Sequence, residues 1–357
     1  TVKMYIAYLT GEDSLYREAL ALPVGYCNPF RLETIDVLAK AKAACPDSER
    51  PYYYLGNLLY NIQPDNAIKE WKQCVAMNPN ADLAWRNLGW ANWLHTRDYA
   101  ESVRCYKKAI EINPDAALYL EECDQAMEAN RTPVPERYEL LKSHHATCEK
   151  RYYPLSQEVV LGTWCGDYDY VLGLLDRCYF PTREGVANFH DNFVDACVLA
   201  GKAKLAEGDA KGAIALYEKA FTYPENHQVF LVDERATHDA QINYELGVAY
   251  ESLGDTDNAT KYYTLAADQD FKLKGSKDFR YWTGLALQKL GRKAEAKALF
   301  SQMVADGKAA VVTEYRSFYG AEGTTASTTE SKNSAAYFTQ ALGELGLGHK
   351  KQADRLF

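Results

Sequence analysis

Two halves of the stretch from Pro51 to Pro114 repeat each other, and no other feature of the chain restricts its fold so strongly. The equivalent residues lie 35 positions apart: Trp71 and Tyr106, Cys74 and Ala109, Asn78 and Asn113, and Pro79 and Pro114. A period of about 34 residues is typical of helix–turn–helix solenoids. In such a solenoid each repeat buries its apolar face only against its neighbours. The sequence therefore predicts an all-α solenoid rather than one compact core.

Each repeat is expected to form two antiparallel helices with a glycine where they cross. In the first repeat the helices are predicted over residues 51–61 and 65–77, and Gly56 lies where a side chain would push them apart. Asn78-Pro79 should end the second helix, because a proline disfavours helical backbone in the residue before it. The same pattern returns around four further glycines: Gly89, Gly201, Gly247 and Gly284.

The shared motif is an aromatic residue, two further residues, Leu-Gly, and then a small residue, an aromatic residue, Ala and Pro. This motif resembles tetratricopeptide repeats. The resemblance implies a right-handed superhelix of roughly seven or eight helical hairpins. It assigns two regular repeats to residues 51–114, three repeats with a long link at 223–240 to residues 191–309, and a truncated last repeat to residues 336–357.

The rest of the chain departs from the motif. Residues 1–50 are expected to be N-terminal helices of a degenerate repeat, and residues 115–190 degenerate helical hairpins, with single helices over 117–129 and 135–150. Residues 310–335 are rich in Gly, Ser and Thr, so we expect an irregular, mobile segment there.

A narrower resemblance covers nearly the whole chain. It rests on the strings GYCNPFRLETIDVL, PYYYLGNLLY, WRNLG and FTYPEN, which are similar to the C-terminal repeat region of a largely uncharacterised microbial family. In that family a β-rich region, similar to mutarotase-like sugar-binding domains, precedes the repeats. The resemblance implies a fragment of a larger protein with a link to carbohydrate metabolism. The string PTREGVANF departs from the Gly- and Glu-rich string, containing a Trp, that is expected at its place.

Composition restricts the partners and the compartment. A formal net charge of −9 argues against a general affinity for nucleic acid, which needs a basic surface. No apolar run approaches the roughly 18 residues of a membrane span, and no secretory segment is visible at the start. The nine cysteines are odd in number and include no Cys-x-x-Cys, so we predict reduced core residues and a cytoplasmic protein.

The inner face of the superhelix is the predicted binding surface. The resemblance implies that the first helix of each repeat lines a concave groove, with inward-facing residues three before, one after and four after the motif glycine. The candidates are Tyr53, Asn57, Tyr60, Arg86, Asn87, Trp90, Trp93, Tyr244, Glu251, Trp282 and Gln288. Such a groove suits a peptide with apolar anchors or a sugar stacked on the rings; alternatively, the rings only pack neighbouring helices. A clamp for a terminal carboxylate is not expected, because Tyr53 and Trp90 replace two of its members.

No catalytic constellation is predicted, and no cofactor or metal. Adjacent histidines point about 100° apart on a helix, so His144 and His145 should be exposed and should not chelate. His190 and Asp191 are expected at a helix start, and His227, His238 and Asp239 beside the long link. The acidic residues are expected to be solvated, including Glu121, Glu122, Glu184, Asp233 and Glu234.

Three functions remain open at this point. The favoured one is a non-catalytic scaffold that binds a protein or peptide partner, or its own missing N-terminal domain, in the aromatic groove. The second is the accessory helical half of a carbohydrate-active enzyme, whose groove helps to shape a sugar site. The third is a module for self-association, because the ends of a cut solenoid expose apolar helix faces.

Overall fold

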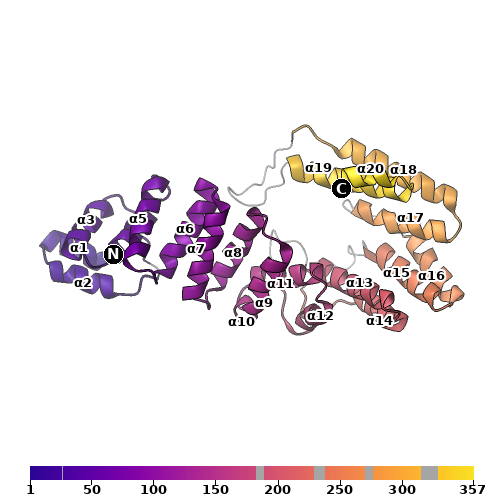
Figure 1. Cartoon of the computed structure of the whole chain (residues 1–357), viewed down its shortest axis with the longest axis horizontal. Coiled ribbons are helices and arrows are strands. Elements are labelled where there is room, and N and C mark those ends of the chain that lie inside the picture. Colours follow the sequence, from indigo (N-terminus) through magenta and orange to yellow (C-terminus); the bar gives the residue numbers. More distant parts are fainter. Residues whose placement is uncertain (26, 182–188, 229–237, 270–275, 315–328) are drawn as a thin grey trace. The chain divides into compact units, whose positions relative to one another are not determined.

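The structure is a computed structural model. It describes the whole chain except residues 26, 182–188, 229–237, 270–275 and 315–328 (Figure 1). Every regular element in the described part is a helix, which confirms the all-α prediction. The chain divides into two compact units, Thr1–Leu161 (unit 1) and Gly162–Phe357 (unit 2), and each is described by itself below.

Unit 1 is a series of helices in which chain neighbours pack on one another (Figure 1). The helices are α1 (Val2–Thr10), α2 (Asp13–Ala21), α3 (Thr34–Ala44), α4 (Arg50–Leu59), α5 (Pro64–Met77), α6 (Asp82–Ala91), the π-helix η1 (Asn92–Thr96), α7 (Tyr99–Ile112), α8 (Ala117–Ala129), α9 (Val134–Ser143), α10 (His145–Cys148) and α11 (Tyr152–Trp164), whose last three residues belong to unit 2. The helix pairs α4–α5 and α6–α7 are the two regular repeats. Their shared core includes Tyr54, Leu58, Ala67 and Leu88.

The helix predicted over residues 135–150 is instead two helices, α9 and α10, with a break at His144. Side-chain donors compete for the helix backbone at this point: Ser143 Oγ and His144 Nδ1 both lie within 3.0 Å of the Leu140 carbonyl oxygen. Local bonds of this kind offer the backbone an alternative to the helical ladder.

Unit 2 continues the same architecture. Its helices are α12 (Tyr168–Arg177), α13 (His190–Ala206), α14 (Ala210–Ala220), α15 (Asp239–Ser252), α16 (Thr256–Ala267), the 3-10 helix η3 (Ser276–Phe279), α17 (Arg280–Lys289), α18 (Lys293–Ala310), α19 (Thr329–Gly346) and α20 (Lys350–Leu356). The pairs α13–α14, α15–α16 and α17–α18 are repeats. Their core includes Tyr263, Ala286, Phe300 and Met303.

The segment expected to be irregular, residues 310–335, is helical from Thr329 onward, where α19 begins. Glycines bring α18 and α19 very close together: a Cβ on Gly307 would lie 2.7 Å from the Ala336 carbonyl oxygen, and one on Gly343 would lie 2.8 Å from that of Phe300. This packing stabilises a helix that its Ser- and Thr-rich start does not favour by itself. The part at 315–328 lies outside the described residues.

A glycine–ring contact joins the two helices of every regular repeat, as predicted for Gly56. The glycine belongs to the first helix and the ring to the second, and the pairs are Gly56–Trp71, Gly89–Tyr106, Gly201–Tyr217, Gly247–Tyr263 and Gly284–Phe300. A Cβ at any of these glycines would lie 2.3–2.8 Å from a ring atom. The five rings are at most 4% exposed. The period seen in the sequence is thus the period of this contact.

Glycines also form the turns between the two helices of a repeat. Gly208 and Gly254 have φ of 86° and 75°, a left-handed conformation that favours glycine at a helix end. The next residues, Asp209 and Asp255, each accept a hydrogen bond from the backbone N–H three residues later, at 2.8 and 3.1 Å. The turn therefore ends one helix and caps the start of the next.

The nine cysteines form no disulfide. Seven are buried: Cys45, Cys74, Cys105, Cys123, Cys148, Cys178 and Cys197. Burial raises the pKa of the Cys74 thiol to about 12, which suits a core residue rather than a reactive one. Among the described residues, no helix combines the length and the apolar character that crossing a bilayer requires.

Candidate functional site

A row of hydrogen-bonded polar side chains runs across α4, α6 and α8 in unit 1. Asn57 Oδ1 accepts from the Trp71 indole N–H at 3.1 Å and from Asn87 Nδ2 at 2.8 Å. Asn57 also hydrogen-bonds the Tyr53 side chain. Burial raises the pKa of Tyr53, and this hydrogen bond opposes that effect. The row connects successive first helices, so the structure brings three predicted site residues together.

Arg86 continues this row onto α8. Its Nε donates to Glu122 Oε2 at 2.7 Å, its Nη2 contacts Glu122 Oε1, and its Nη1 donates to Asn87 Oδ1 at 3.2 Å. The Glu122 side chain is only 5% exposed, whereas that of Arg86 is 25% exposed. We call Tyr53, Asn57, Asn87, Arg86 and Glu122 the polar track. Because the Arg86–Glu122 pair is bidentate, the guanidinium charge is neutralised within the track.

The prediction that Glu121 and Glu122 are solvated is wrong. Glu122 is buried against Arg86, and Glu121 pairs with Arg151. Sequence reasoning missed the buried pair because its partners lie 36 residues apart, although that separation is itself a signal. A basic inward-facing residue that is followed about one repeat later by an acidic residue places opposite charges on neighbouring first helices, where they can pair.

Aromatic candidates lie beside the polar track. The Trp90 and Trp93 rings meet edge to face, with centroids 5.6 Å apart, and the Arg86 guanidinium lies 5.3 Å from the centroid of the Trp90 ring. Tyr60 instead packs on Trp71, at 5.4 Å. All four predicted aromatics of unit 1, including Tyr53, are half-buried. They contribute to helix packing and still present part of their surface to solvent.

The later candidates belong to unit 2. Tyr244 packs on Tyr263 at 5.8 Å. Trp282 stacks on Phe279 at 5.6 Å. Glu251 accepts from the Tyr263 hydroxyl at 2.8 Å and from Lys289 Nζ at 2.5 Å. Tyr244 and Glu251 on α15 therefore contact Tyr263 on α16, the second helix of their repeat. Glu251 also contacts α17, and Trp282 contacts η3.

Unit 2 contains a pair like Arg86–Glu122. Lys202 on α13 donates to Glu245 on α15 at 3.2 Å, and the Glu245 side chain is 7% exposed. Farther along the chain, Gln288 on α17 donates to the Gly346 carbonyl on α19 at 3.2 Å. Polar contacts between successive first helices thus recur, and the repeat motif does not predict them.

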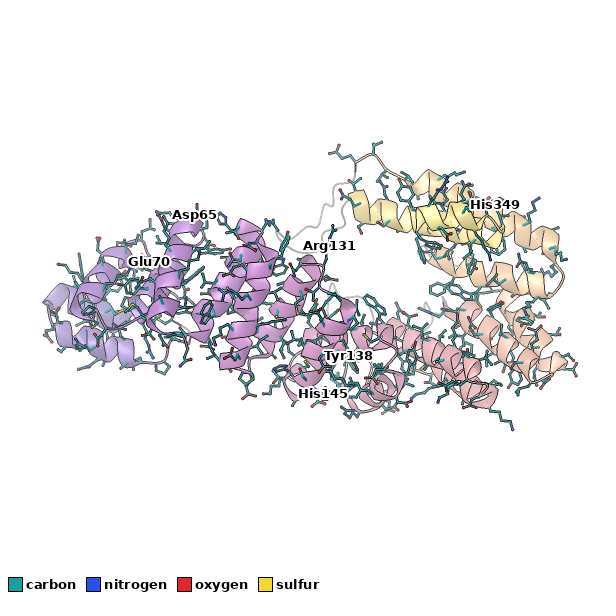
Figure 2. The ribbon with its side chains drawn as sticks, in the orientation of Figure 1. Asp65, Glu70, Arg131, Tyr138, His145 and His349 are labelled. Carbon is teal, nitrogen blue, oxygen red and sulfur yellow. The ribbon has the colours of Figure 1, made fainter. Side chains whose placement is uncertain are left out.

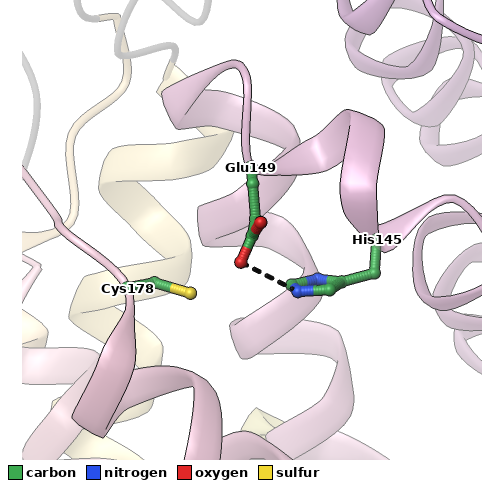
Figure 3. A group of neighbouring side chains, drawn as sticks. All are labelled: His145, Glu149 and Cys178. Atoms are coloured by element: carbon green, nitrogen blue, oxygen red, sulfur yellow. Dashed lines mark hydrogen bonds and ion pairs between the residues drawn. The ribbon is translucent and has the colours of Figure 1, made fainter.

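The histidines differ from their predicted setting. His145, at the start of α10 (Figure 2), is half-buried rather than exposed. Its Nδ1 lies 3.0 Å from buried Glu158, and its Nε2 lies 3.1 Å from Glu149 (Figure 3). His144, at the break between α9 and α10, bonds the Leu140 carbonyl oxygen of α9. These contacts link α10 to α11, so a structural role accounts for His145.

The histidines around the long link are buried. His190 begins α13, as predicted, and stacks on Tyr223 at 4.2 Å. His238 Nε2 lies 3.5 Å from Asp191 Oδ1, and its ring lies 4.4 Å from that of Phe279. His227 lies among phenylalanine rings. The predicted solvated acids Glu184, Asp233 and Glu234 lie outside the described residues.

Two hollows lie away from the polar track. One, of about 440 Å³, is in unit 2 and is lined by α12, α13 and α14, including Tyr168, Lys204 and Glu207. The other, of about 360 Å³, is in unit 1 and is lined by Tyr5, Phe30 and their neighbours. Neither contains a residue predicted for the binding surface.

Several solved structures are similar to this chain. One is YrrB, described as a TPR protein with an unusual peptide-binding site, at 14% identity over 52% of this chain and 92% of that chain, with a TM-score of 0.37. Another is PilF of Pseudomonas aeruginosa, at 12% identity over 84% and 97%, with a TM-score of 0.35. A third is Naa15/Naa10 bound to HypK-THB, at 16% identity over 91% and 50%, with a TM-score of 0.37. These scores are too low for any of the three to support an argument about this chain.

Family profiles described as tetratricopeptide repeat match both units. They cover residues 57–117, 194–227, 240–272 and 278–306. The matched stretches contain four of the five glycines in the glycine–ring contacts, and the remaining one, Gly56, lies directly before the first stretch. Sequence period, helix pairing and profile matches agree that this chain is a protein of tetratricopeptide repeats.

Proposed function

We propose that this chain is a non-catalytic scaffold that holds an extended peptide segment of a partner protein along the polar track of unit 1. Its tetratricopeptide repeats support a role in protein interaction. The observation that carries the finer proposal is the hydrogen-bonded row of half-buried amide and aromatic side chains on α4 and α6, which Arg86 connects to Glu122 on α8.

The polar track matches the chemistry of a peptide main chain. A side-chain amide offers two N–H donors and an acceptor oxygen with two lone pairs. Asn57 Oδ1 already accepts two hydrogen bonds, so Asn57 offers a peptide an N–H donor, whereas Asn87 offers both an N–H donor and one acceptor lone pair. Their positions are already fixed by bonds to Trp71 and Arg86. Groups that are held in place before binding lose less conformational entropy when the ligand arrives. Trp90 and Trp93 add apolar surface for a side chain of the peptide.

Charge narrows the class of peptide. Arg86 is the cation of the polar track, and Glu122 neutralises it through two contacts. A terminal carboxylate that bound Arg86 would displace Glu122. Glu122 would then be a buried acid without a comparable partner, which costs several kcal/mol. We therefore infer an internal segment, recognised through its main chain and apolar side chains.

Selection of a random peptide library on the full chain tests this proposal. The selected peptides should bind a Tyr53→Ala, Asn87→Ala, Trp90→Ala variant at least tenfold more weakly, as measured by fluorescence anisotropy. Arg86 is kept in this variant, because its removal would leave Glu122 buried and unpaired. Peptides with a free or an amidated C-terminus should bind alike.

Trp164→Ala is the matched control. Its ring is 64% exposed and lies outside the polar track, so this variant should bind as the wild type does. Circular dichroism must show full helical content for every variant. Selected peptides that bind the triple variant as tightly as the wild type would place the site elsewhere.

A further inference from the structure

Two segments of unit 2 meet in a short backbone clasp. One follows α12 and contains Phe180; the other follows α14 and contains His227. The Phe180 N–H donates to the Asn226 carbonyl at 2.8 Å, and the Gln228 N–H donates to the Phe180 carbonyl at 3.0 Å. Asn226 Nδ2 adds bonds to the carbonyls of Leu175 and Cys178, at 2.8 and 2.6 Å. The clasp therefore connects chain segments nearly 50 residues apart.

The His227 side chain forms the core of this clasp. It is 3% exposed, and the rings of Phe180, Phe189 and Phe193 lie 5.3, 6.0 and 5.2 Å from its own. Its Nε2 lies 2.8 Å from the Leu175 carbonyl oxygen. A carbonyl only accepts, so Nε2 carries the proton.

The other ring nitrogen of His227 is in a different situation. Nδ1 is buried and has no hydrogen-bond partner in the part of the chain that the structure describes. In the neutral ring Nδ1 carries a lone pair, which faces apolar surroundings. Protonation would place a second N–H and a full charge there, which is unfavourable without an acceptor.

The charged groups near His227 do not compensate for such a charge. Asp176 on α12 and Lys219 on α14 face it, and these two pair with each other at 2.7 Å, so their effects oppose. His190 lies beyond Phe193, at 5.6 Å from that ring. Burial lowers the pKa of His227, in agreement with this geometry.

We propose that the contact between Phe180 and His227 is an acid-sensitive clasp, which neutral His227 holds closed and which protonation of His227 opens. This device lies in unit 2 and goes beyond the proposed peptide binding of unit 1. The opened state takes up a proton near the ordinary histidine value of about 6.5, and the closed state does so only at lower pH. The clasp is therefore fully stable above that pH and loses stability as the pH falls below it.

Hydrogen exchange of the full chain tests the clasp. The Phe180 and Gln228 amides should be protected at pH 7.5. At pH 5.5, after correction for intrinsic exchange, their protection should fall about tenfold, because one pH unit below the open-state value favours the protonated open form by that factor. His227→Gln keeps a donor for Leu175 but does not titrate, so its protection should change little.

His95→Gln is the control, because His95 is a partly exposed histidine of unit 1 that pairs with exposed Asp65. It should retain the pH dependence of the wild type at Phe180 and Gln228. An equal fall in His227→Gln would assign the effect to another group and overturn the proposal. If His227→Gln does not fold, the test rests on the wild type: equal protection of the Phe180 and Gln228 amides at pH 7.5 and 5.5 overturns the proposal.

Discussion

At the scale of single residues, five glycines are fixed by the ring that each one meets rather than by backbone conformation. Gly201 is an example: a Cβ there would lie 2.3 Å from Cε1 of Tyr217, whose ring is fully buried. Gly173 on α12 is different, since the nearest atom to its Cβ would be the Arg177 guanidinium nitrogen at 3.8 Å, an ordinary contact.

Alanine substitution should therefore change stability in opposite directions at these two positions of unit 2. Gly201→Ala is expected to lower the free energy of unfolding by about 1–3 kcal/mol, because the buried ring must move. Gly173→Ala should raise it by about 0.5–1 kcal/mol through better helix propensity. Urea unfolding followed by circular dichroism measures both. A change of the same sign in the free energy of unfolding of both variants would show that the ring contact does not determine the effect of alanine.

At the scale of elements, buried ion pairs fix how neighbouring helices dock. Arg137 on α9 donates through Nε and Nη2 to both oxygens of Asp124 on α8, at 2.8 and 3.0 Å. Their side chains are 5% and 0% exposed. Removing one partner of such a pair leaves a buried charge, whereas removing both does not.

Arg137→Met should accordingly destabilise unit 1 by about 3–5 kcal/mol, and a second change, Asp124→Leu, should restore much of that loss. Lys3→Met serves as the comparison. It breaks an exposed pair with Glu18 at 2.9 Å and should cost less than about 1 kcal/mol. Thermal unfolding of the three variants gives the values. A double variant less stable than Arg137→Met would refute this account of the pair.

The elements also show what could be predicted from the sequence. The helices around Gly56 and Gly89 were predictable, because each repeat uses the same side chains at the same spacing for a contact within itself. Glu122, Arg137 and His227 were not, since their partners lie on other helices and the motif does not specify those positions. The inward-facing residues were named from the motif, but their bonds to one another depend on neighbouring repeats. Whether they bind a peptide stays a prediction.

At the scale of the whole molecule, each unit has a core of its own. Repeat arrays are stabilised by contacts between neighbours, so cooperativity does not have to extend along the entire chain. We expect urea unfolding in two phases. Gly89→Ala should shift the phase of unit 1, and Gly201→Ala the phase of unit 2. A single transition, displaced equally by both variants, would show that the chain unfolds as one cooperative unit.

The ring used in the glycine–ring contact differs between the units. Unit 1 uses Trp71 and Tyr106, whereas unit 2 uses Tyr217, Tyr263 and Phe300, so a tryptophan makes this contact only in unit 1. Four of the six tryptophans lie in unit 1, and of the two in unit 2, Trp164 is already 64% exposed in the folded state. Indole emission shifts when a buried ring meets water. The change in tryptophan fluorescence on unfolding therefore reports mainly on unit 1, and it can follow the unfolding of this unit without an attached dye.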